Sequence, residues 1–248
     1  MLKNITLYVE KDYDALSKRA ALIFAIALQE NHEGNYGFAT GSTPVGMYDA
    51  LIEMHKAGEI DLSKVTAYNL DEYYPIQKDN DQSYDYFMAA NLFDAVGLPK
   101  KRRNIPNGEA PNPTVEAADY ETKLEKSGGI ELQILGIGHN GHIGFNEPAQ
   151  AFSCKTAYLP LTEVTIQANA RFFADESEVP KHAITMGIHA IMMAKRVLLL
   201  VSGSAKAAIL HDALKGPITP LVPASILQLH PNVIVVADAE AAAILVGQ

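Results

Sequence analysis

The segment Leu135–Pro148 carries the residue types best suited to chemistry in this chain. It reads Leu-Gly-Ile-Gly-His-Asn-Gly-His-Ile-Gly-Phe-Asn-Glu-Pro, so glycines surround two histidines and a carboxylate. The apolar run Leu132–Leu135 is typical of a buried strand, and ligands of open α/β sheets bind outside the carboxyl ends of such strands. The segment therefore predicts a ligand-facing loop in which His142 and Glu147 are suited to proton transfer.

Two other interpretations of this loop are open from the residues alone. Gly136-x-Gly138-x-x-Gly141 after a strand fits a dinucleotide fingerprint, with Glu163 at about the spacing of a ribose contact. Such a fingerprint opens a helix, whereas Ile143–Pro148 shows no helical period and ends in a pre-proline residue, which favours extended backbone. The dinucleotide interpretation is therefore the weaker one.

A zinc site is the second alternative. His139, His142 and Glu147 are chemically able to supply three ligands. Cys154, the only cysteine, has no cysteine partner with which to extend the set. We expect no metal, and His142 acting as an acid–base group is the favoured interpretation.

Two segments are suited to hold an anion, because each begins a helix directly after an apolar strand. Thr40-Gly-Ser-Thr-Pro44 offers hydroxyls and free backbone N–H groups, with Gly41, Ser42 and Thr43 as candidate phosphate contacts. Lys206 stands in the first turn of a helix that runs to Leu214, where a cation opposes the helix dipole unless it holds an anion. The structural alternatives are an ordinary capped helix at Thr40–Pro44 and a solvated surface lysine at Lys206. For Arg171 the structural alternative is a cation that complements a helix C-terminus.

Two adjacent carboxylates, Asp71 and Glu72, follow the predicted strand Val65–Leu70. Successive side chains of an extended chain point in opposite directions, so we expect one of the two to face the ligand. A turn that uses Asp71 as a local cap is the alternative.

The elements that must position these residues alternate between short apolar runs and amphipathic helical stretches. This pattern predicts a Rossmann-like α/β fold, in which helices cover both faces of a mostly parallel sheet. Asp12 is placed to cap the first helix, whose Leu16, Ala20, Ile23, Phe24, Ala27 and Leu28 fall on one face. The predicted strands are Ile5–Val9, Tyr36–Ala39, Val65–Leu70, Leu132–Leu135, Val197–Val201 and Val233–Val236, and Arg102–Thr114 is predicted to be a loop before a further helix.

Composition narrows the class of protein. The 248 residues, 48% of them hydrophobic, are enough for one large α/β domain, and the absence of a linker favours a single domain over 1–248. A formal net charge of −9 without a basic stripe argues against nucleic acid or anionic membranes as partners. The segment Met1–Tyr8 lacks the apolar core of a signal peptide and one cysteine forms no internal disulfide, so we expect a soluble cytoplasmic protein.

Taken together, these motifs resemble those of the glucosamine-6-phosphate deaminase family. The resemblance spans nearly the whole chain, and the motifs occur in the family's order. They are Thr40-Gly-Ser-Thr-Pro44, Asn69-Leu-Asp-Glu-Tyr73, Gly141-His-Ile-Gly-Phe-Asn-Glu-Pro148, Ala170-Arg-Phe-Phe173, Gly203-Ser-Ala-Lys206 and Ser225-Ile-Leu-Gln-Leu-His-Pro231.

The resemblance implies a cofactor-free conversion of glucosamine 6-phosphate and water to fructose 6-phosphate and ammonia. By matching position, His142 would assist ring opening, Glu147 would hold and tune the imidazole, and Asp71 would abstract the C2 proton. The substrate phosphate would be held by Gly41, Ser42, Thr43, Arg171 and Lys206.

Two departures from the family's pattern bear on this expectation. Asn140 stands where some members have aspartate, so we expect it to orient His142 without supplying charge. Some members are hexamers activated by N-acetylglucosamine 6-phosphate through basic residues after the Asn-Glu-Pro motif. Here Ala149–Leu161 offers only Lys155, so we expect no such activation, and the oligomeric state is left undetermined.

Two rival functions share this kind of fold. A non-catalytic sugar-phosphate sensor would not need Asp71, His142 and Glu147 together. A phosphogluconolactonase-like hydrolase would not need a carboxylate for C2 proton abstraction. Fold alone does not separate these readings.

Overall fold

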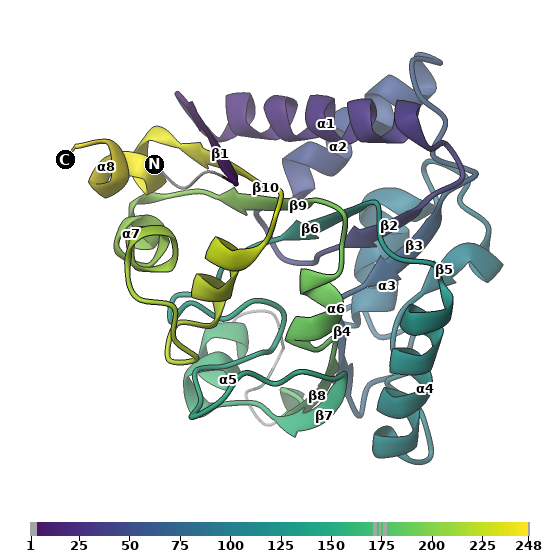
Figure 1. Cartoon of the computed structure of the whole chain (residues 1–248). Helices are drawn as coiled ribbons and strands as arrows, with labels where there is room; N and C mark the ends of the chain where they lie inside the picture. Colours follow the sequence, from purple (N-terminus) through teal and green to yellow (C-terminus); the bar gives the residue numbers. More distant parts are fainter. Residues whose placement is uncertain (1–3, 171–172, 174, 176–177, 248) are drawn as a thin grey trace.

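The computed structural model describes residues 4–170, 173, 175 and 178–247 (Figure 1). Its main sheet has seven strands in the order β1-β10-β9-β6-β2-β3-β5, and every neighbouring pair is parallel. The strands are β1 (Ile5–Glu10), β2 (Asn35–Phe38), β3 (Thr66–Asn69), β5 (Arg103–Asn104), β6 (Leu132–Leu135), β9 (Val197–Val201) and β10 (Val233–Asp238).

Helices cover both faces of this sheet, as the sequence predicts. In Figure 1, α1 and α2 lie on one side of the strands and α6 and α7 on the other. The helices are α1 (Tyr13–Glu30), α2 (Val45–Lys56), α3 (Tyr84–Met88), α4 (Pro113–Lys126), α5 (Glu163–Ala170), α6 (Ile188–Met192), α7 (Ala207–Lys215) and α8 (Ala239–Val246). A π-helical turn η1 (Ala89–Phe93) and the 3-10 turns η2 (Lys100–Arg102), η4 (Ser204–Lys206) and η5 (Pro223–Leu229) complete the described helical segments.

The predicted strands are confirmed: Leu132–Leu135 and Val197–Val201 have the predicted boundaries, and the others are shifted by one or two residues. The expected loop Arg102–Thr114 is partly wrong, because Arg103 and Asn104 pair with β3 as the short strand β5. The helix predicted from Asp12 is confirmed: the Asp12 carboxylate accepts the N–H of Ala15 at 2.8 Å. Such a cap satisfies one of the N–H groups that a helix leaves unpaired at its start.

A second sheet was not predicted from the sequence. It is antiparallel, in the order β4-β8-β7, and consists of β4 (Asp71–Tyr74), β8 (His182–Thr185) and β7 (Ala157–Pro160). Only one residue, Leu70, separates β3 from β4, so the chain passes directly from the main sheet into the small one. The small sheet therefore places Asp71 at the junction of the two sheets.

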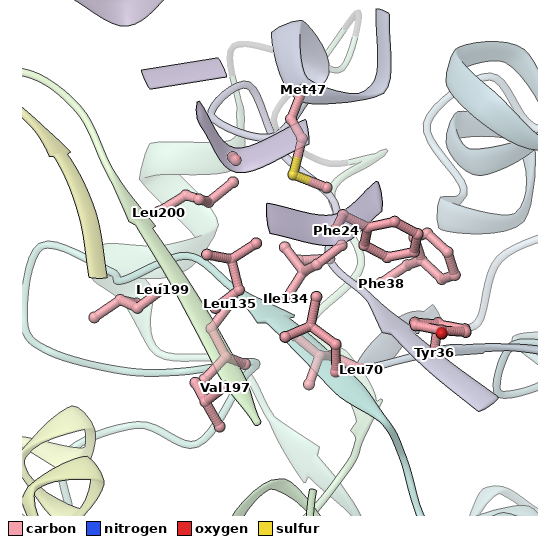
Figure 2. Close-up of a cluster of buried hydrophobic side chains, with 14 of the residues drawn as sticks. Phe24, Tyr36, Phe38, Met47, Leu70, Ile134, Leu135, Val197, Leu199 and Leu200 are labelled. Atoms are coloured by element: carbon pink, nitrogen blue, oxygen red, sulfur yellow. The ribbon is translucent and has the colours of Figure 1, made fainter. Parts of the chain in front are cut away.

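The main core lies on both faces of the sheet, and α1 and α2 bury one of these faces. Figure 2 shows Phe24 and Met47 from these helices packed against Tyr36, Phe38 and the aliphatic residues of β6 and β9. Phe38 meets Phe93 edge-on, with ring centroids 5.4 Å apart, a preferred aromatic geometry. This packing fixes the strands whose ends carry the candidate site.

Among the described residues, no helix combines the length and apolar character needed to cross a bilayer.

Candidate active site

The loop after β6 folds back on itself instead of opening a helix. The N–H of Gly138 donates to the carbonyl of His142 at 2.9 Å, and the N–H of Gly141 donates to the carbonyl of Gly138 at 3.1 Å. Gly141 has φ 87°, a conformation that favours glycine. Within the described stretch 136–162 no helix forms, so the geometry of a dinucleotide fingerprint is not realised.

Gly138 is required by the imidazole of His142. A Cβ added at Gly138 would lie inside van der Waals contact with three atoms of the His142 ring. The glycine therefore provides the surface on which the ring rests, and any larger side chain would move the ring.

His142, Asn140 and Glu147 form one hydrogen-bonded cluster. Asn140 donates from Nδ2 to Glu147 Oε2 at 2.6 Å, and its Oδ1 lies 2.8 Å from His142 Nδ1. Because the Asn140 oxygen can only accept, the proton on this imidazole edge belongs to Nδ1. The neutral ring then presents Nε2 as an acceptor, which is the form that a general base requires.

Glu147 stays ionised in this cluster. Its side chain is 10% exposed, and His142 Nδ1 lies 3.4 Å from Oε1. Burial acts to raise its pKa, but the His142 contact and hydrogen bonds from Thr165 and Asn140 outweigh burial and lower the pKa to about 2. The carboxylate is thus a fixed negative charge at neutral pH.

His139 does not join the cluster to make a metal site. It is exposed, and among the described residues no group of three or more His, Cys, Asp or Glu side chains could hold a metal ion. The three-ligand arrangement considered from the sequence is therefore not formed within that part of the chain.

Asp71 reaches the same loop from the small sheet. It pairs with Thr185 of β8, and a Cβ at Gly144 would lie 3.3 Å from Asp71 Oδ2 and 2.9 Å from the Thr185 hydroxyl. Thr185 Oγ1 also accepts the N–H of Phe145 at 3.0 Å. The loop carrying His142 and the strand carrying Asp71 are thereby held against each other.

The two adjacent carboxylates have different surroundings. Burial raises the pKa of Asp71, which is 6% exposed, to about 8, and the nearby charge of Glu72 adds to the shift. Glu72 accepts the N–H groups of Tyr73, Tyr84 and Asp85 at 2.9 Å, so it pairs the first two N–H groups of α3, whose cap residue is Ser83. Burial also raises the pKa of Glu72, to about 7, although these N–H donors oppose the shift.

The candidate phosphate contacts lie at one edge of the main sheet. Gly41–Thr43 follow β2, and Lys206 follows β9; both strands are hydrogen-bonded to β6, which leads into the His142 loop. Lys206 Nζ donates to the carbonyl of Ile137 in that loop at 2.7 Å. Parallel strands bring their carboxyl ends to the same edge, which explains why segments distant in sequence meet there.

Some details of these contacts differ from expectation. Pro44 is the cap residue of α2 and makes no side-chain cap hydrogen bond, so the ordinary hydroxyl-capped helix considered as the alternative is not formed. Instead the Tyr13 hydroxyl accepts the N–H of Gly46 at 2.9 Å and lies 3.0 Å from the carbonyl oxygens of Ser42 and Thr43. Arg171 lies outside the described residues.

The sequence analysis missed two threonines that contact the site. Thr185 supports the loop through Phe145, and the Thr165 hydroxyl donates to Glu147 Oε1 at 2.5 Å. No local sequence pattern indicates either residue, because Thr185 reaches the loop through β8 of the small sheet and Thr165 reaches it through α5.

Comparison with known proteins places the chain among sugar-phosphate enzymes. Residues 10–235 match the family model described as glucosamine-6-phosphate isomerases/6-phosphogluconolactonase. A glucosamine-6-phosphate deaminase of Alkaliphilus oremlandii (strain OhILAs) is 49% identical over 239 residues, which are 96% of this chain and 99% of the relative. One from Thermoanaerobacter pseudethanolicus is 50% identical over 234 residues, 94% of this chain and 92% of the relative.

Solved structures agree with this placement. A monomeric glucosamine-6-phosphate deaminase matches with a TM-score of 0.93 at 41% identity, covering 97% of this chain and 99% of that chain. A 6-phosphogluconolactonase from Trypanosoma cruzi matches with a TM-score of 0.79 at 17% identity, covering 99% of this chain and 98% of that chain, and so shares the fold. From this agreement in sequence and structure, the chain belongs to the glucosamine-6-phosphate isomerase/6-phosphogluconolactonase family.

Proposed function

We propose that this chain is a glucosamine-6-phosphate deaminase, which converts D-glucosamine 6-phosphate and water to D-fructose 6-phosphate and ammonia. The observation that carries the proposal is identity of about 50% over nearly the full length to relatives of that name. The lactonases, at about 20% identity, resemble the chain in fold. Asp71, His142 and Glu147 supply the acid–base groups that this reaction needs.

Ring opening is the first proposed step, and His142 carries it. The imidazole transfers a proton between the anomeric hydroxyl and the ring oxygen, which breaks the C1–O5 bond and releases the open-chain aldehyde. Asn140 fixes the tautomer through its 2.8 Å contact to Nδ1, and the ionised Glu147 stabilises the positive charge that develops on the ring.

Isomerisation and deamination follow, with Asp71 as the proposed base. The carboxylate removes the proton from C2, and the resulting enolamine is reprotonated at C1. Water then adds to the C2 iminium carbon and ammonia leaves, which produces the ketone. A pKa of about 8 suits a group that must both accept and return a proton near neutral pH.

The substrate phosphate is proposed to lie at the edge where β2 and β9 end. Gly41, Ser42 and Thr43 contribute backbone N–H and hydroxyl donors, while Lys206 and Arg171 contribute charge. The short Lys206–Ile137 contact ties the phosphate end of the site to the loop that carries His142. The proposed chemistry uses no cofactor, and we propose that residues 1–248 act as one catalytic unit.

The test is release of ammonia and fructose 6-phosphate from glucosamine 6-phosphate in metal-chelated D₂O buffer. We expect turnover with deuterium at C1 of the product, and its loss in a folded Asp71→Asn variant. Asp79→Asn, at an exposed position, is the matched control and should keep activity.

Binding of glucosamine 6-phosphate without turnover would favour the sensor function. Hydrolysis of 6-phosphogluconolactone without C1 exchange would favour the hydrolase. Either result would refute the deaminase proposal.

A further inference from the structure

A threonine in the first turn of α5 contacts one carboxylate oxygen of Glu147, while Asn140 contacts the other. Thr165 is 6% exposed, and its hydroxyl donates to Glu147 Oε1 at 2.5 Å. A short hydrogen bond from a hydroxyl to an ionised carboxylate is charge-assisted and stronger than a neutral one. This contact joins α5 to the loop after β6.

The hydrogen of the Thr165 hydroxyl is directed by a second threonine. Thr162 Oγ1 donates to Thr165 Oγ1 at 3.1 Å and accepts the N–H of Thr165 at 3.3 Å. Because each hydroxyl has one hydrogen, Thr165 accepts from Thr162 and gives its own hydrogen to Glu147. The two hydroxyls form a directed chain that ends on the carboxylate, and each bond polarises the next.

Both oxygens of Glu147 are consequently engaged from different elements. Oε2 accepts from Asn140 in the loop, whereas Oε1 accepts from Thr165 in α5 and lies 3.4 Å from His142 Nδ1. Rotation of the carboxylate toward the imidazole would lengthen at least one of these bonds. We infer that Thr165 is a positioning residue, which holds Glu147 at a distance where it supports His142 without displacing it from Asn140.

This inference rests on the proposed function, because it assigns Thr165 a part in ring opening through Glu147 and His142. Without the hydroxyl, Oε1 would turn toward Nδ1 and compete with the Asn140 oxygen for the same hydrogen. The imidazole would then tilt away from the orientation that reaches the ring oxygen. Such a loss affects the chemical step more than substrate binding.

The test compares Thr165→Val, which keeps the shape and removes the hydroxyl, with Thr165→Ser, which keeps the hydroxyl. We expect Thr165→Val to lower kcat for ammonia release about tenfold or more, the usual effect of losing a hydrogen bond to a charged group, with KM changed by less than about twofold. Thr165→Ser should retain at least about a third of kcat. Thr122→Val is the matched control, because the exposed Thr122 hydroxyl bonds only the carbonyl of Ala118 in α4.

A second measurement does not depend on catalysis. In protein labelled with ¹³C at the glutamate side-chain carboxyl, Thr165→Val should shift the Glu147 resonance, while Thr122→Val should leave it unchanged. An unshifted resonance, an unchanged kcat in an active parent, or equal losses in the Val and Ser variants would overturn the inference. If the parent shows no turnover but Thr165→Val still shifts the Glu147 resonance, the proposed function is refuted and the Thr165–Glu147 contact is established.

Discussion

Replacement of Asp71 by asparagine should abolish turnover and at the same time stabilise the folded protein. The buried Asp71 carboxyl has a pKa of about 8, compared with 3.8 for an ordinary aspartate. Between these two values the unfolded chain releases the proton while the folded chain keeps it, so rising pH favours unfolding. Asparagine resembles the protonated acid and carries no such penalty.

The magnitude follows from the pKa difference. One pKa unit corresponds to about 1.4 kcal/mol, so the stability advantage of Asp71→Asn should grow by at most about 2.7 kcal/mol between pH 5 and pH 7. The advantage is smallest below the unfolded pKa of 3.8, increases through neutral pH, and levels off above about pH 8. A catalytic carboxylate that is buried commonly lowers the stability of the folded enzyme, and its removal then raises stability while abolishing activity.

Urea unfolding of the parent and Asp71→Asn at several pH values from 5 to 8.5 measures this difference. The exposed Asp79→Asn controls for the loss of one negative charge. A difference in free energy of unfolding that stays constant across this range, or a parent more stable than the variant at pH 8, would refute a raised pKa at Asp71.

Four further predictions follow from the site. Because the base must be ionised, kcat/KM should rise with pH from 6 toward 8 and level off above the pKa of Asp71 of about 8; a fall over that range in a pH–rate profile would contradict the assignment. Gly138→Ala should lower kcat at least about tenfold, because the added methyl displaces the His142 ring; steady-state kinetics on the folded variant decide it. Asn140→Asp should place a second carboxylate beside Glu147 and His142, which the amide now contacts at 2.6 Å and 2.8 Å. The added negative charge favours the protonated imidazole and should move the acid limb of the pH–rate profile to higher pH; an unchanged profile would argue against this contact. Lys206→Met should raise KM about tenfold and weaken inhibition by inorganic phosphate, and equal phosphate inhibition in both proteins would remove Lys206 from the phosphate site.

Local patterns were sufficient to predict every strand of the main sheet except β5, and the loop that carries His142. The central strand β9 is a contiguous apolar run, and β10 is apolar up to its last residue, as burial between two helical layers requires. The edge strand β1 keeps most of its side chains exposed, and its apolar residues Leu7 and Val9 are recognisable by alternation with polar neighbours only in part. Gly138 and Gly141 close the turn around His142 through contacts between residues at most four positions apart, so the turn could be predicted from the spacing of the motif.

The small sheet was not predictable in this way. Asp71–Tyr74 begins with two acids, which are depleted in strands, and is followed by proline, so only its two tyrosines favour a strand. Its partner β8 comes much later in the chain and pairs in turn with β7, so the small sheet depends on packing between distant segments. The sequence predicted that the side chains of Asp71 and Glu72 point in opposite directions. That Glu72 accepts the N–H groups of Tyr84 and Asp85 at the start of α3 became apparent only in the folded structure.

The sequence by itself therefore determined which chemical groups the chain carries and which strand end presents each of them, because these depend on periodicity and on contacts between near neighbours. Only the tertiary structure decided how those groups act together. It placed Asp71 beside Gly144 through the pairing of Asp71 with Thr185, brought Lys206 to Ile137, and set Thr165 against Glu147. The physical reason is that hydrogen bonds and desolvation depend on distance in space, and a folded chain sets those distances independently of separation along the sequence.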